Sequence, residues 1–187
     1  MPGSKMTVTP RFYVLIAATL IVVPLPWLLG WLLAAVIHEL CHYAALLFCK
    51  APIYHVEIDV QGAVIETSGL TWGQAVICAL AGPAGGLILL AGSNVFPRVA
   101  VCALLQSVYN LLPVYPLDGG RALHGVLTGL LSVSAADLVC TIVGYFTILS
   151  VLVLCCCAAF AWNLGYLPLF FGLAFCVRAM RAKIPCK

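Results

Sequence analysis

Charged residues are scarce in this sequence of 187 residues. They make up 8% of the chain, whereas hydrophobic residues make up 64%; a soluble domain carries about 25% charged residues. So few charges cannot cover a surface that faces water, which excludes an ordinary soluble domain. The length fits a single domain, and we therefore expect one membrane-embedded domain over residues 1–187.

The sequence also lacks the patterns of nucleic-acid-binding and disulfide-stabilised proteins. Its nine Lys and Arg give a net charge of only +3, and they form no basic stripe interleaved with aromatic residues, so we expect no nucleic-acid partner. Ten cysteines are present, but none forms a C-x-x-C pair and their spacing suggests no disulfide framework. Most lie in apolar runs, where cysteine behaves as a small hydrophobe. We interpret them as packing residues.

Apolar stretches of roughly membrane-spanning length run through the chain. A transmembrane helix needs about 20 residues, and Pro24 and Pro26 divide the first long stretch because proline ends or kinks a helix. Residues 122–131 predict a short additional helix. The six spans that we expect lie at about 11–26, 27–49, 72–92, 95–114, 137–160 and 163–180.

A different pattern separates the second and third spans. Residues 54–60 alternate strictly between polar and apolar side chains, which is the period of a β-strand. Gln61-Gly62 can turn the chain, and residues 63–67 can return as a partner strand. We therefore expect an all-α polytopic membrane protein with a small membrane-associated β-hairpin at 53–67.

The basic residues indicate an orientation. Six spans place both termini on one side of the membrane, together with eight of the nine basic residues; only Arg98 lies opposite. Loops rich in Lys and Arg face the cytoplasm. We therefore expect both termini on the cytoplasmic side. The eight residues are Lys5, Arg11, Lys50, Arg121, Arg178, Arg181, Lys183 and Lys187.

The second expected span contains the run His38-Glu39-Leu40-Cys41-His42. Residues four apart share one helix face, about 6 Å apart along the axis, so His38 and His42 can grip one Zn²⁺. Glu39 points about 100° away, which lets it reach a water molecule without ligating the metal. Charged residues in a membrane cost at least about 2.5–3.5 kcal/mol each, and a metal supplies these side chains with a partner.

A catalytic zinc takes a third protein ligand and keeps one position open. Asp118 stands out because it follows the fourth expected span, on the same side as the end of the second, in a turn-rich segment before Gly119-Gly120. An aspartate in a tight turn is the alternative. The candidates for the third ligand are His55, Glu57, Asp59, Glu66, Asp118, His124 and Asp137.

Three motifs in this order resemble the site-2 protease family of intramembrane zinc metalloproteases. They are the run at 38–42, Ala81-Gly82-Pro83, and the segment Asn110-Leu111-Leu112-Pro113-Val114-Tyr115-Pro116-Leu117-Asp118-Gly119-Gly120. The match is closest to the bacterial sporulation branch, whose members process pro-sigma factors.

The resemblance implies a role for each motif residue. His38, His42 and Asp118 match the zinc ligands of one Zn²⁺ per chain, and Glu39 matches the general base. Asn110 matches an asparagine that orients substrate or the oxyanion; a helix cap or an interhelix hydrogen bond is its alternative role. The hairpin resembles a membrane-associated sheet that receives an extended substrate strand.

The expected topology places the site toward the cytoplasm. The resemblance also implies a bacterial cytoplasmic membrane and a membrane-anchored substrate such as a pro-sigma or anti-sigma factor. Regulatory membrane proteins or a second copy of the chain are further expected partners. Two features depart from the family. Cys41 stands where glycine is usual, and we expect neither a CBS nor a PDZ domain.

Two other functions compete with proteolysis. Intramembrane His and Asp residues also mark ion pathways, which would suit a metal-ion transporter. The last two expected spans offer few polar residues beyond Asp137 and Asn163 to line such a path. An inactive scaffold of the same fold is the other alternative, and the complete set of candidate ligands argues against it.

Overall fold

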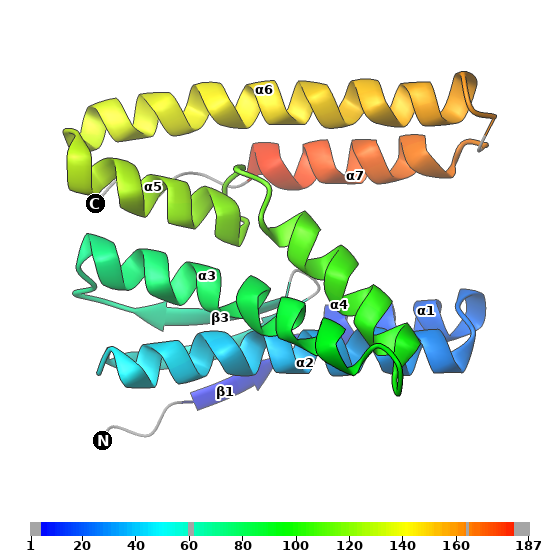
Figure 1. The fold of residues 1–187 in the computed structure, drawn as a ribbon, viewed down its shortest axis with the longest axis horizontal. Coiled ribbons are helices and arrows are strands. Elements are labelled where there is room, and N and C mark those ends of the chain that lie inside the picture. Colours follow the sequence, from blue (N-terminus) through cyan, green and yellow to red (C-terminus); the bar gives the residue numbers. More distant parts are fainter. Residues whose placement is uncertain (1–4, 60–61, 164, 182–187) are drawn as a thin grey trace. The chain divides into compact units, whose positions relative to one another are not determined.

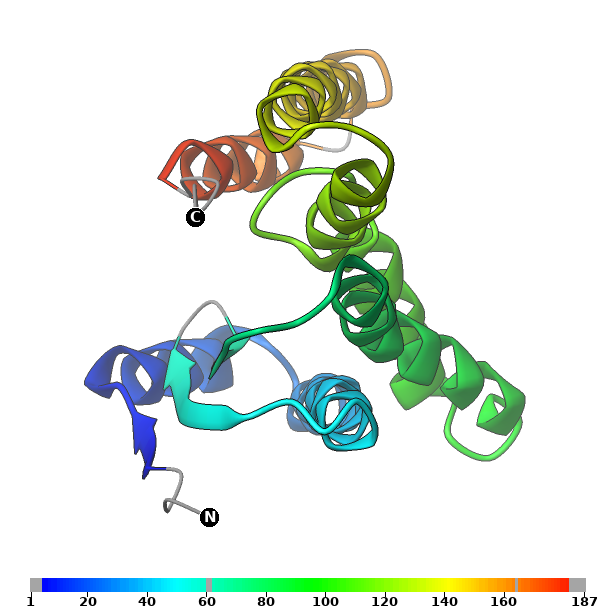
Figure 2. The ribbon, with the colours of Figure 1, turned by 90° about the vertical axis from the view of Figure 1, so that its left-hand side faces the viewer.

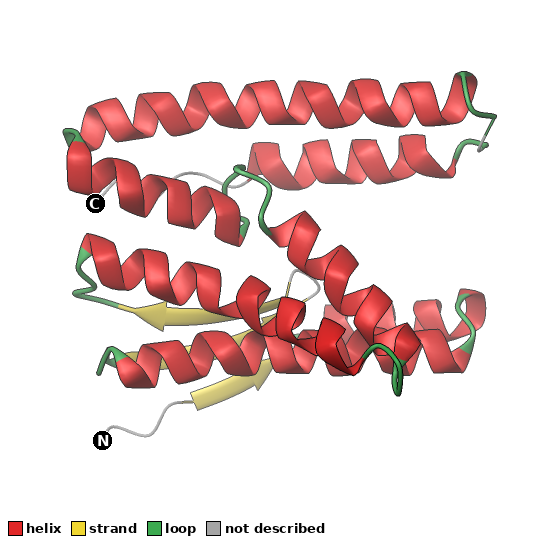
Figure 3. Cartoon of the chain, viewed as in Figure 1, coloured by secondary structure: helices red, strands yellow, loops and turns green. Residues whose placement is uncertain are grey.

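The computed structural model describes residues 5–59, 62–163 and 165–181, and these are mostly helical (Figure 3). The chain divides into two compact units, Met1–Tyr109 and Asn110–Lys187, here called unit 1 and unit 2. One domain over 1–187 stays a prediction. The elements are β1 Lys5–Val8, α1 Pro10–Val22, α2 Leu25–Phe48, β2 Ile53–Asp59, β3 Gly62–Thr67, α3 Trp72–Ile88, η1 Leu89–Gly92, α4 Pro97–Asn110, α5 Asp118–Leu130, α6 Val133–Phe160 and α7 Leu167–Arg181 (Figure 1).

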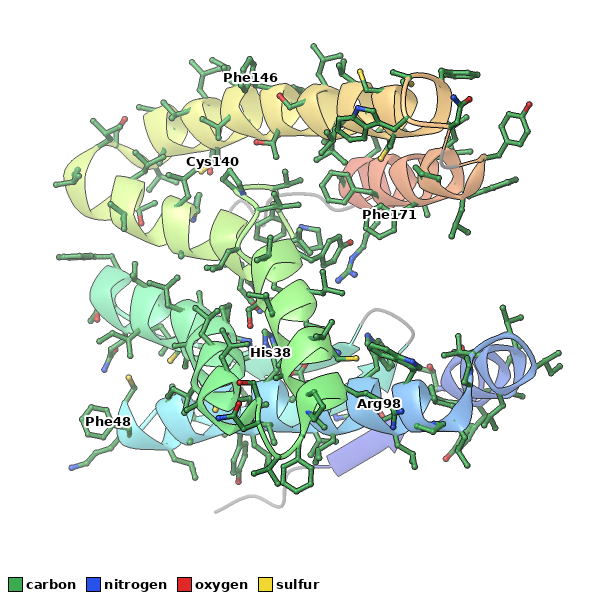
Figure 4. The ribbon with its side chains drawn as sticks, turned by 45° about the vertical axis from the view of Figure 1, so that its right-hand side comes forward. His38, Phe48, Arg98, Cys140, Phe146 and Phe171 are labelled. Atoms are coloured by element: carbon green, nitrogen blue, oxygen red, sulfur yellow. The ribbon has the colours of Figure 1, made fainter. Side chains whose placement is uncertain are left out.

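Three helical segments among the described residues are long and apolar enough to cross a membrane. They comprise 24 residues of α2, 21 residues over α3 and η1, and 28 residues of α6. Large apolar side chains project outward from these and other helices, as Phe48, Phe146 and Phe171 do in Figure 4. An apolar surface of this kind requires lipid as its solvent. The expectation of an all-α membrane protein is confirmed.

The expected number of six spans is not supported. Helices α1, α4 and α7 have 13, 14 and 15 residues, which falls short of the roughly 20 residues that a span needs. The apolar composition of these segments led to the higher count, but α1 stops before Pro24 and α4 begins only at Pro97. The break at Pro24 is where the sequence places it, because α2 begins at the next residue.

The hairpin is present as strands β2 and β3, which pair antiparallel from Ile53↔Thr67 to Asp59↔Gly62. Residues 60–61, which we expect to contribute to the turn, lie outside the described residues. The sequence did not predict the third strand, β1, which pairs parallel with β2 and gives the order β1-β2-β3. The sheet and α1 lie on one side of α2, and the strands run along its C-terminal half (Figures 1 and 2).

Helix α3 begins with a capping box that fixes its first turn. The Thr71 hydroxyl accepts a hydrogen bond from the backbone N–H of Gln74, and the Gln74 side chain accepts one from the backbone N–H of Thr71. These bonds satisfy donors that a helix start otherwise leaves open. The Gln74 side chain also donates to the Cys49 carbonyl oxygen at 3.3 Å, which holds the start of α3 to the end of α2.

Helix α4 packs against α3 through glycine and serine. Ser107 is fully buried, and its hydroxyl donates to the Pro83 carbonyl oxygen at 3.1 Å. A β-carbon at Gly86 would collide with the Ser107 hydroxyl and would lie 3.3 Å from the Ala103 carbonyl oxygen. Small residues at a membrane helix interface let the backbones approach closely. Gly86 is therefore turned toward α4, whereas Gly82 meets the histidines of α2.

Unit 2 is built from α5, α6 and α7. Ser132 caps α6 by accepting from the backbone N–H of Ala135, and the imidazole Nε2 of His124 on α5 lies 2.8 Å from an Asp137 carboxylate oxygen on α6. Gly172 of α7 packs against Cys155 of α6. The short helix expected at 122–131 is α5, which begins four residues earlier than expected, at Asp118.

The contact between α3 and α4 predicts a coupled pair of substitutions. Gly86→Ala should destabilise the protein by about 1–3 kcal/mol, because the added methyl group overpacks the Ser107 site. Ser107→Ala should cost about 0.5–1.5 kcal/mol for its lost hydrogen bond. The double variant should cost less than the sum, since removing the hydroxyl makes room for the methyl group.

Unfolding in detergent, followed by circular dichroism, measures these differences. Gly73→Ala is the control on the same helix, because a β-carbon there meets nothing within 4 Å. Additive costs in the double variant would contradict the assigned contact.

Candidate metal centre

The two histidines of the motif lie together on α2, as the helical spacing predicts. Their Nε2 atoms are 3.1 Å apart. The rings meet edge to face, with centroids 4.7 Å apart and planes at 82°. His38 is buried and His42 half-buried, so the pair faces the protein and not the lipid.

A backbone carbonyl orients His42. Its Nδ1 lies 2.6 Å from the Cys78 carbonyl oxygen of α3. A carbonyl only accepts, so Nδ1 carries the proton and donates, which leaves the lone pair of Nε2 free to point toward His38. Metal-binding histidines are typically held by such a second partner, which fixes their tautomer and ring orientation.

Gly82 of α3 leaves space in front of both imidazoles. A β-carbon at this position would collide with His42 Nε2 and would lie 2.7 Å from His38 Nε2. Gly82 itself is buried. The missing side chain therefore keeps open the position toward which both ring nitrogens point.

The histidine pair fits a zinc ion. Two nitrogen ligands of a tetrahedral zinc, with Zn–N bonds of about 2.0–2.1 Å, lie roughly 3.3 Å apart. The observed 3.1 Å between the Nε2 atoms agrees with this separation. The protonated Nδ1 of His42 and the open space at Gly82 are both what a metal ligand on this helix face requires.

Cys41 is accommodated by a second glycine of α3. A β-carbon at Gly85 would collide with the Cys41 sulfur and would lie 3.0 Å from the Cys41 β-carbon. The thiol therefore fills the space that Gly85 leaves. This contact supports the interpretation of Cys41 as a packing residue.

Glu39 lies one residue after His38 on α2 and is half-buried. Its position on the helix turns it about 100° from His38. Its role as the base stays a prediction.

Asp118 is the first residue of α5 and is buried. The sequence predicted a turn here, but a helix begins instead. Glycines are tolerated at a helix start, because the first backbone N–H groups of a helix have no intrahelical partner. β-Carbons at Gly119 and Gly120 would collide with the backbone of Leu111 and Val114. These glycines therefore let the preceding segment pack tightly on α5. Asp118 belongs to unit 2, and its role as a ligand of a zinc held in unit 1 stays a prediction.

The other candidate residues have different positions. Asn110 is the last residue of α4 and is half-buried, and its role stays a prediction. His55 Nε2 lies 3.1 Å from the Thr7 hydroxyl within the sheet, and His124 is paired with Asp137 in unit 2. Sequence reasoning missed the Cys78 carbonyl, because any residue type supplies a carbonyl and leaves no signal in the sequence.

The comparison with solved structures decides the fold. No family model matches the chain. It is similar to the Site-2 Protease from Methanocaldococcus jannaschii, with a TM-score of 0.65 and 18% identity, over 100% of this chain and 95% of that one. The chain has the site-2 protease fold. The resemblance inferred from the motifs is confirmed at this level.

A curated relative adds a match in sequence. A Synechocystis protein with the name "Putative zinc metalloprotease sll0528" is 31% identical over 54% of this chain. The match covers 33% of that relative, so the chain spans about a third of the relative's length.

The space at Gly82 predicts a selective loss of metal binding. Gly82→Ala should reduce the bound zinc to near zero, because the methyl group occupies the place in front of the two Nε2 atoms. Helical content should stay unchanged, which circular dichroism checks beside the zinc content measured by atomic emission. Gly73→Ala should keep its zinc, and a Gly82→Ala protein with one zinc per chain would refute this assignment.

Proposed function

We propose that the chain is a zinc-dependent intramembrane endopeptidase, which hydrolyses a peptide bond in or beside a membrane-spanning segment of its substrate. The observation that carries this proposal is the pair His38 and His42, with Nε2 atoms 3.1 Å apart on an apolar helix long enough to span a membrane. The fold and the name of the curated relative support the same class of reaction.

Each residue of the site has a separate role in hydrolysis. A zinc ion bound at the histidines supplies Lewis acidity, which polarises the peptide carbonyl and makes a water molecule more acidic. Glu39 takes the proton from the water and later delivers it to the leaving amide nitrogen. The Cys78 carbonyl holds the His42 ring in place throughout, because its oxygen accepts a hydrogen bond from Nδ1–H.

We assign the third ligand to Asp118. A carboxylate together with two imidazoles is a common donor set for catalytic zinc and leaves one position open. The assignment rests on the match of the segment at 110–120 to the family motif, and the burial of Asp118 at a helix start supports it.

The substrate would bind to the sheet as an extended strand. Strands β1 and β3 are the edges of the sheet, and an added strand would present its backbone carbonyls in order. Asn110 is assigned to orienting that strand or the oxyanion, on the motif match alone.

The finer assignments rest on the resemblance to the sporulation branch. The substrates would be membrane-anchored regulators such as pro-sigma or anti-sigma factors. The protein would cross the bacterial cytoplasmic membrane several times, with its termini and active site toward the cytoplasm, as the placement of the basic residues favours. Regulatory membrane proteins or a second copy of the chain would control access.

Removal of the base tests the catalytic proposal. Glu39→Gln should lower cleavage of a membrane-tethered reporter by about 10²–10⁴-fold, since the amide cannot take the proton from water. Immunoblots of reporter fragments measure the rate, and zinc content should stay at one per chain. Asp137→Asn in α6, whose carboxylate lies beside His124, is the control. Equal cleavage by wild type and Glu39→Gln would sink the proposal.

Removal of the third ligand tests Asp118 separately. Asp118→Asn should weaken zinc binding by more than about 100-fold, because even the outer partners of metal ligands account for about 10–100-fold. Competition with a chelator measures the affinity. Asp137→Asn, which removes a carboxylate that lies beside His124, should leave it unchanged. An Asp118→Asn protein with wild-type zinc affinity would assign the third ligand elsewhere.

A further inference from the structure

Two cysteine thiols meet where the end of α2 lies against α3. The Cys78 sulfur is 3.9 Å from the Cys49 sulfur, and both residues are reduced. Cys49 is the C-cap of α2 and is half-buried, whereas Cys78 is buried within α3. The Gln74 side chain donates to the Cys49 carbonyl oxygen, so a second contact holds the same two segments together.

Cys78 also contacts the candidate metal centre. Its carbonyl oxygen accepts the hydrogen bond from His42 Nδ1 at 2.6 Å. One residue therefore touches Cys49 through its sulfur and a zinc-binding histidine through its backbone. The Cys78 sulfur is only a few covalent bonds from the Cys78 carbonyl that orients His42. A change at the sulfur can therefore move that carbonyl.

We propose that Cys49 and Cys78 form a reversible disulfide, and that this disulfide weakens zinc binding through His42. The proposal rests on the metal centre of the proposed function. It adds a redox-sensitive modification site to that centre.

The oxidation proceeds by exchange with a small-molecule disulfide such as oxidised glutathione. The more accessible Cys49 attacks one sulfur of the small molecule, which releases one small thiol and leaves a mixed disulfide on Cys49. The Cys78 sulfur then displaces the second small thiol and forms the Cys49–Cys78 bond. The small molecule gains two electrons, and the two protons of Cys49 and Cys78 end on the two released thiols.

The geometry predicts the direction of the effect. A disulfide bond is about 2.05 Å long, so the two sulfurs must approach by nearly 2 Å from their present separation. Part of that movement falls on the backbone of Cys78. Its hydrogen bond from His42 is already short at 2.6 Å, so a displacement lengthens or misaligns it. Loss of such an orienting partner typically costs about 10–100-fold in metal affinity.

The test uses the full chain, purified in detergent and loaded with zinc. The protein is treated with oxidised glutathione, its disulfides are mapped by mass spectrometry, and zinc affinity is measured by chelator competition. We expect a Cys49–Cys78 crosslink and a loss of about 10–100-fold in affinity, both reversed by dithiothreitol. Cys49→Ser should abolish both effects and, since Cys49 is a half-buried cap residue, should keep the fold.

Cys156→Ser is the matched control, because Cys156 is an exposed thiol far along the chain in α6; both effects should persist in it. Absence of the crosslink, a crosslink that leaves zinc affinity unchanged, or a loss of affinity that persists in Cys49→Ser would each overturn the proposal. Failure of the reduced wild type to bind zinc would instead refute the metal centre itself, since the crosslink is mapped independently of zinc.

Discussion

The close approach of α3 to the histidine face of α2 is the contact on which the candidate metal centre depends. Gly82 makes that approach possible, because any side chain there would occupy the place in front of the two Nε2 atoms. The same approach brings the Cys78 carbonyl within hydrogen-bonding distance of His42. One helix–helix contact therefore provides both the partner that orients His42 and the space in front of the two histidines.

Several weaker interactions keep α3 at this position. Its capping box fixes the first turn, and Gln74 connects that turn to the end of α2. Toward α4, the buried Ser107 hydroxyl donates to the carbonyl oxygen of Pro83, the residue next to Gly82. In lipid, helices gain little from apolar burial against one another, so packing of small residues and interhelical hydrogen bonds carry the association.

Features that depend on neighbours in the sequence could be predicted. The spacing of His38 and His42 determines their shared helix face, Pro24 marks the start of α2, and the alternation at 54–60 indicates the hairpin. Strand β1 was missed because its four residues have a partner about 50 positions away, and short-range patterns carry no trace of such pairing. The count of six spans goes beyond what the described helices support, because apolar composition does not determine where a helix ends.

The position of Cys41 illustrates the same limit. The sequence shows a thiol between two histidines and predicts a packing residue, but it does not show what the thiol packs against. The contact with Gly85 shows this, and that contact joins residues 44 positions apart. A glycine in one helix compensates for the larger residue in the other, so the pair has to be considered together.

The sheet has a consequence for the solvent around the histidines. Its strands run along the half of α2 that carries them (Figure 1), and the outer backbone groups of β1 and β3 have no neighbouring strand within the described sheet. Hydrocarbon does not tolerate open sheet edges, because unpaired N–H and C=O groups there cost several kcal/mol each. These edges therefore lie outside the hydrocarbon, or water or another polar chain reaches them. In either case the surroundings beside the half of α2 that carries His38 and His42 are polar, and hydrolysis needs water there.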